Sequence, residues 1–129
     1  MTFKLFIEAC HWTAQNTFFW IIMTLVFMDL ATGLMKAFYT KTPNSTTALQ
    51  GVLKHSAIVM MICAVSIFGH IMKLDFISNG LIIFFATSYG ISILENLGQM
   101  NIIVPKWLKE ILVKVQQDYD NDPKGGTKK

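Results

Sequence analysis

Charged residues are scarce in this sequence. Asp, Glu, Lys and Arg make up 15% of its 129 residues and hydrophobic residues make up 53%, whereas about a quarter of a typical globular domain is charged. Three windows contain no charged residue at all: 9–28, 55–72 and 76–94. Each is about as long as the ~18 residues that cross the hydrocarbon core of a bilayer as a helix. So little charge remains for a soluble surface that the pattern predicts an all-α membrane protein with three transmembrane helices.

Cysteine is also rare, and catalytic motifs are missing. Cys10 and Cys63 are too few for a disulfide framework and do not form a CxxC pair. The sequence contains no nucleophile elbow, Walker loop or HExxH motif. His11, His55 and His70 are scattered without the spacing of metal ligands, so we interpret them as interface or packing residues. We therefore expect neither an enzyme nor a bound cofactor or metal.

Arginine is absent, so all eleven basic residues are lysines. Nine of the eleven flank the loop after the first window or follow the third window, and only Lys4 and Lys73 fall on the other side. The positive-inside rule then predicts that the N-terminus lies outside the cytoplasmic membrane and that the C-terminus is cytoplasmic. The basic tail lacks interleaved aromatic residues, which favours contact with anionic lipid and not with nucleic acid.

The windows divide the chain into an N-terminal interfacial segment, a three-span transmembrane domain, an amphipathic helix and a disordered polar tail, at 1–13, 14–104, 105–119 and 120–129. The first segment either lies in the membrane interface or extends the first span. The amphipathic helix suits a membrane surface or a partner helix. We assign three of its residues to the membrane surface: Lys106, Trp107 and Lys109.

A polar stripe runs along the third expected span, at about 80–98. Its residues are spaced at i, i+4, i+7 and i+11, so they share one helical face: Ser88, Ser92, Glu95 and Gln99. An apolar helix with such a stripe and an acid near its end needs a partner for that face. The partner can be another helix, another subunit or water.

The first expected span, at about 18–38, has a stripe of its own. Asp29, Gly33 and Lys36 are spaced at i, i+4 and i+7, and Gly33 allows close approach of another backbone. A carboxylate in mid-span is costly wherever it faces lipid, so we interpret Asp29 as functional. Lys36 and Glu95 lie at similar depth; they either pair or reach the headgroups separately. We predict that the first and third spans face each other through Gly33 and Ser92, within or between subunits.

Several motifs resemble those of the three-span toxin-secretion and phage-lysis holins. Residues 29–37, Asp-Leu-Ala-Thr-Gly-Leu-Met-Lys-Ala, resemble the family's first-span signature. Residues 51–54, Gly-Val-Leu-Lys, resemble its loop motif. The most distinctive match is Ser-Ile-Leu-Glu-Asn, 92–96, followed by Pro105 ten residues after the glutamate. Two residues depart from the pattern: Tyr89 stands where many relatives carry another acid, and Asn101 stands where glycine is usual.

The resemblance implies a holin, which is a small phage-coded protein of the bacterial cytoplasmic membrane. Its expected partners are other copies of itself, the lipid bilayer, and an endolysin or secreted toxin that leaves through the lesion. The candidates for the oligomer interface and pore stripe are Asp29, Gly33, Lys36, Ser88, Ser92, Glu95 and Asn96.

Two other functions stay open. A non-conducting accessory subunit of a larger membrane complex would also carry polar stripes on its spans. A small proton-coupled transporter would use a mid-span acid in an oligomer, with aromatic residues around that acid.

Overall fold

The computed structural model describes residues 2–121, and every regular element in that range is a helix. The five helices are α1 (Phe3–Gln15), α2 (Thr17–Tyr39), α3 (Ser45–Ile71), α4 (Asp75–Gln99) and α5 (Lys106–Asn121). Three of them, α2, α3 and α4, are long and apolar enough to cross a membrane. The predicted all-α architecture with three spans and a further amphipathic helix is therefore confirmed.

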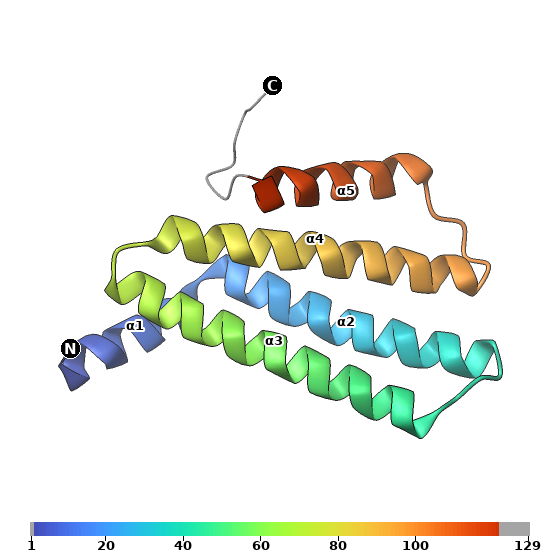
Figure 1. The fold of residues 1–129 in the computed structure, drawn as a ribbon, viewed down its shortest axis with the longest axis horizontal. Coiled ribbons are helices and arrows are strands. Elements are labelled where there is room, and N and C mark those ends of the chain that lie inside the picture. Colours follow the sequence, from blue (N-terminus) through green and yellow to red (C-terminus); the bar gives the residue numbers. More distant parts are fainter. Residues whose placement is uncertain (1, 122–129) are drawn as a thin grey trace.

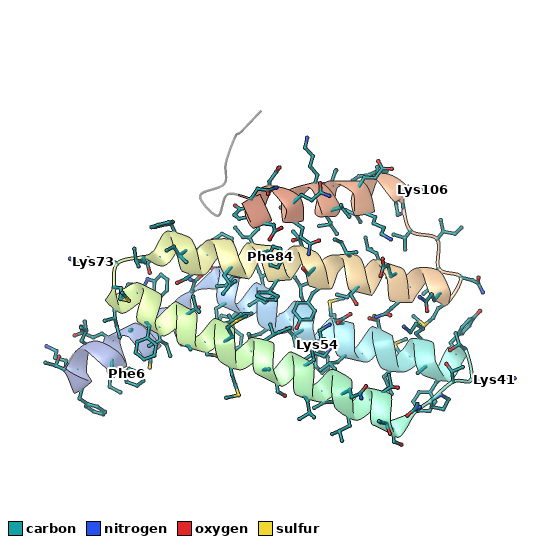
Figure 2. The ribbon with its side chains drawn as sticks, in the orientation of Figure 1. Phe6, Lys41, Lys54, Lys73, Phe84 and Lys106 are labelled. Atoms are coloured by element: carbon teal, nitrogen blue, oxygen red, sulfur yellow. The ribbon has the colours of Figure 1, made fainter. Side chains whose placement is uncertain are left out.

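The three long helices lie lengthwise beside one another, and α5 runs back along α4 (Figure 1). The short α1 lies at the end of the bundle where α3 turns into α4 (Figure 1). Lys41 and Lys106 lie at one end of the bundle and Lys73 lies at the opposite end (Figure 2). Lys41 and Lys73, which the sequence placed on opposite sides of the membrane, therefore lie at opposite ends of the bundle, whereas Lys54 lies part-way along α3 (Figure 2).

Local signals set the ends of the helices. The side chain of Asn16 accepts a hydrogen bond from Phe18 N at 2.9 Å at the start of α2, and that of Asn44 accepts one from Thr46 N at 2.9 Å at the start of α3. Such caps satisfy amide groups that have no partner within the helix. At the end of α4, Asn101 takes a left-handed conformation with φ 61°. Asparagine tolerates this conformation, which explains why the chain can turn here without glycine.

The helices extend beyond the apolar windows. α3 and α4 begin at Ser45 and Asp75, before the charge-free windows that predicted them, because caps and turns define a helix end and hydropathy does not. The helix α5 continues to Asn121, two residues past its expected end. The rest of the expected disordered tail, 122–129, lies outside the described residues.

The core is a narrow apolar layer between α2, α3 and α4. Its buried members are Ile22, Val26, Ile62, Ile82 and Tyr89. Near the α3–α4 turn the two backbones approach closely, because a Cβ at Gly69 would overlap Ser78 Oγ. That hydroxyl donates a hydrogen bond to the Val65 carbonyl at 2.9 Å across the same crossing. Small residues at a helix crossing are typical of packing in membranes.

At the same end of the bundle, aromatic stacking joins α1 to α3. The rings of Trp12 and His70 are stacked with centroids 4.1 Å apart and planes 10° from parallel. His70 Nδ1 also lies 2.9 Å from Asp75 Oδ1, at the start of α4. These contacts fix α1 against the bundle as a separate helix, joined to α2 through the extended residue Asn16.

The outer faces of α2 and α3 are apolar. Their large exposed side chains include Phe27, Leu34, Met35 and Phe38 on α2, and Leu53, Met60 and Phe68 on α3. These faces match lipid tails, and in water they would form a patch far larger than a soluble monomer tolerates.

Candidate functional site

Asp29 lies in the middle of α2 and points into the bundle, with only 7% of its surface exposed. Its Oδ2 lies 3.5 Å from His55 Nε2 on α3, and its Oδ1 accepts a long hydrogen bond of 3.4 Å from Asn96 Nδ2 on α4. One carboxylate therefore contacts both of the other long helices. A buried carboxylate needs such partners, because leaving it unpaired in a low-dielectric interior is costly.

His55 connects this carboxylate to Tyr89. Its Nδ1 lies 2.9 Å from the Tyr89 hydroxyl, while its Nε2 faces Asp29, so both ring nitrogens have a partner. Tyr89 is 5% exposed and would otherwise bury an unsatisfied hydroxyl. Which nitrogen carries the proton depends on the tautomer, but either one allows a continuous chain from Asp29 to Tyr89.

Asn96 completes the set. Its Nδ2 also donates to Thr32 Oγ1 at 3.2 Å, and Thr32 Oγ1 lies 3.2 Å from the Asp29 carbonyl oxygen. Gly33 lies directly beside this contact, because a Cβ there would be 3.7 Å from Asn96 Nδ2. We define the buried polar cluster as Asp29, Thr32, His55, Tyr89 and Asn96. In lipid, hydrogen bonds of this kind hold helices together because no water competes for them.

A second polar site joins α4 to α5. Glu95 Oε1 accepts a hydrogen bond from Lys109 Nζ at 2.9 Å, and the Gln116 amide bonds to Ser88 Oγ. Between them, Leu112 packs so closely that a Cβ at Gly90 would lie 3.1 Å from Leu112 Cδ1. Two residues of the polar stripe predicted on the third span, Ser88 and Glu95, therefore have their partners on α5.

The ion pair in this contact is half-exposed, with 46% of the Lys109 side chain and 52% of the Glu95 side chain accessible. Exposed pairs contribute only about 0.2–1 kcal/mol in water. The apolar face of α5 therefore supplies much of the attachment, through half-buried Leu108, Leu112, Val115 and Tyr119.

The model of the bacteriophage holin family matches residues 9–117 of this chain. The chain belongs to the bacteriophage holin family. One similar protein is an uncharacterized protein of Halalkalibacterium halodurans, 31% identical over 108 residues that cover 76% of this chain and 77% of the relative. Another is a probable holin of Bacillus phage phi105, 25% identical over 101 residues that cover 78% of this chain and 75% of the relative. No solved structure matches the chain.

The region shared with the holin family contains all three candidate spans, the buried polar cluster and the α4–α5 contact. Family membership and three long apolar helices together make this chain an integral membrane protein. Among residues 2–121, no group of three or more His, Cys, Asp or Glu side chains is placed to hold a metal ion.

The structure brings together some of the predicted site residues and separates others. As predicted, α2 faces α4, but Gly33 lies against Asn96 and not against Ser92, which is half-buried elsewhere on α4. Within one chain Glu95 pairs with Lys109, and Lys36 makes no ion pair among the described residues. An oligomeric or pore-lining role for this stripe stays a prediction.

The three α5 residues that the sequence assigned to the membrane surface do not share one environment. Lys106 and Trp107 are exposed at the start of α5 and remain candidates for that surface. Lys109 instead points to Glu95 on α4. The spacing of the helix could not show this, because an amphipathic helix fits a membrane and a partner helix equally well.

Three residues of the buried polar cluster were not predicted as site residues. His55 was interpreted as a packing or interface residue, and Tyr89 and Thr32 were given no polar role. A usable signal did exist, because Tyr89 and Asn96 are seven residues apart and so share one face of α4, as do Asp29 and Thr32 on α2.

Proposed function

We propose that this holin-family chain accumulates in the bacterial cytoplasmic membrane, assembles with copies of itself, and opens lesions there. A cell-wall hydrolase or toxin then leaves the cytoplasm through these lesions. The family match supports the holin role, and the name of the phi105 relative, a probable holin, agrees with it.

The observation that carries the assembly step is the filled interior of the bundle. Ile22, Ile62 and Ile82 are each 1% exposed or less, and the polar side chains around Asp29 bond to one another across the three helices. Within residues 2–121, packed side chains therefore fill the space between α2, α3 and α4 in a single chain. Any opening must form between chains, so its onset depends on how many chains have accumulated.

The test is inducible expression of this chain alone in a bacterium, with a dye that reports membrane potential. The proposal predicts normal growth during a lag, followed by a sudden loss of potential, and a shorter lag at a higher induction level. An accessory subunit would leave the potential unchanged, and a proton-coupled transporter would give a gradual change without a lag. Either result would remove the proposed function.

A further inference from the structure

The α4–α5 contact has a consistent antiparallel register. As the position on α4 falls from Glu95 to Gly90 to Ser88, the partner on α5 advances from Lys109 to Leu112 to Gln116. Figure 1 shows the same arrangement, with α5 running back along α4. The helix α5 therefore does not project sideways from the bundle; it lies along the span.

This register places polar residues at mid-membrane depth. Ser88 is 11 residues from the end of α4 at Gln99, or about 16 Å at ~1.5 Å per residue. Half the thickness of a hydrocarbon core is about 15 Å. Gln116, which bonds to Ser88, is therefore level with the middle of the membrane when α4 spans it.

The outer face of α5 could not lie against lipid at that depth. Its exposed side chains on this part of the helix are mostly charged or strongly polar: Glu110, Lys114, Gln117, Asp118 and Asp120. Ile111, which is 50% exposed, is a large apolar side chain among them. Ionisable side chains within a membrane face a water-filled cavity or a protein interior, because lipid does not solvate them. The opposite side of the molecule, formed by α2 and α3, exposes Phe27, Met60 and other apolar side chains.

The chain is thus two-sided over the part of α4 that α5 covers, with an apolar side on α2 and α3 and a hydrophilic side on α5. We propose that α5 stays packed on α4 when the chains assemble and that its outer face lines the aqueous wall of the lesion over that depth. Ser88 and Glu95 on α4 then serve to hold α5 in place. This inference rests on the proposed function and adds the surface that faces the cargo.

The alternative arrangement has α5 leaving α4 to lie on the membrane surface before the lesion opens. A reversible crosslink separates the two arrangements. Ser88→Cys and Gln116→Cys are introduced together in a chain whose native thiols are removed by Cys10→Ser and Cys63→Ala. A short bis-thiosulfonate reagent then locks α5 to α4, and a reductant releases it.

The full-length variant is reconstituted in vesicles of phosphatidylethanolamine and phosphatidylglycerol that contain fluorescent dextran. The inference predicts that locked protein releases dextran at the rate of the unlocked protein. Loss of release on locking, with recovery after reduction, would overturn it. If the unlocked variant inserts but releases nothing, while each single-cysteine variant also fails, the proposed function itself is wrong.

A second measurement reports directly on water at the outer face. In a chain without native thiols and without the crosslink, a single cysteine is placed at Gln117, on the outer face of α5, or at Met60, on the apolar face of α3, as the matched control. In vesicles that have opened, a charged maleimide should label the cysteine at position 117 and leave the one at position 60 unlabelled. Equal protection of both positions would show that α5 does not face water and would contradict the inference.

Discussion

At Asp29, Tyr89 and Asn96, single side chains hold the three long helices in register. A hydrogen bond between transmembrane helices contributes on average about 0.6 kcal/mol and at most about 2 kcal/mol, so each bond alone is modest. Removing one partner adds the cost of leaving the other buried and unsatisfied. Within the buried polar cluster, a substitution should therefore cost the most stability where it removes the one hydrogen-bond partner of a buried atom.

Tyr89→Phe tests this directly, because the Tyr89 hydroxyl is the partner of His55 Nδ1 at 2.9 Å. We expect the variant to lose about 1 kcal/mol of unfolding free energy in a detergent titration followed by circular dichroism. Tyr39→Phe is the matched control, since the Tyr39 hydroxyl accepts a bond from Asn101 at 3.0 Å in an exposed position. Equal losses in both variants would show that burial of the cluster adds nothing.

The substitution Asp29→Asn removes the negative charge of the side chain and keeps its size and shape. Its amide oxygen can still accept from Asn96, so we expect normal insertion, together with a shifted onset or a loss of permeabilisation after induction. The control is Asp75→Asn, which changes the other Asp–His pair, at the α3–α4 turn, where the Asp75 side chain is 40% exposed. If Asp29→Asn leaves the onset time of permeabilisation unchanged, or if Asp75→Asn shifts it equally, the mid-span carboxylate does not control the onset.

At the scale of elements, the decisive contact is that of α5 with α4. Its apolar side chains pack against the α4 backbone at Gly90, and its ion pair and amide bond lie on either side of that point. The absence of a side chain at Gly90 is what lets the two helices approach. Packing and polar contacts thus agree on one register.

Gly90→Leu should therefore loosen α5. A Cβ at this position already lies 3.1 Å from Leu112 Cδ1, so the rest of a leucine side chain must displace the helix. We expect faster amide hydrogen exchange throughout α5, measured by mass spectrometry in vesicles. Gly98→Leu is the matched control on the same helix, because a Cβ there has no neighbour within 4 Å. Equal exchange in both variants would mean that Gly90 does not set the contact.

For the whole molecule, the sequence predicted the features that depend on local residue patterns, such as the positions of the long helices. Long apolar windows predicted α2, α3 and α4. The partner of each polar residue was harder to predict. Asp29 and Asn96 are 67 residues apart and His55 and Tyr89 are 34 apart, so only the packing of helices reveals these contacts. For the same reason Glu95 was considered with Lys36 and not with Lys109.

The orientation of the whole chain can be measured from the two ends of the bundle. In a chain without native cysteines, Lys73→Cys should react with an impermeant thiol reagent added outside intact cells before onset, and Lys41→Cys should not. The reason is that Lys41 and Lys73 lie at opposite ends of the bundle (Figure 2). In the sequence, most lysines flank the first loop or follow the third span, which the positive-inside rule places in the cytoplasm. The reverse pattern of labelling would place the N-terminus inside.

The central claim is that many chains together open a lesion wide enough for a folded enzyme. The most direct measurement is single-cell imaging of induced bacteria that contain cytoplasmic fluorescent proteins of graded size, with membrane potential recorded in the same cells. We predict that potential falls after a lag and that protein-sized probes leave the same cell at the same moment. Cells that lose potential but retain every protein probe would contradict the claim and leave only a small-pore protein.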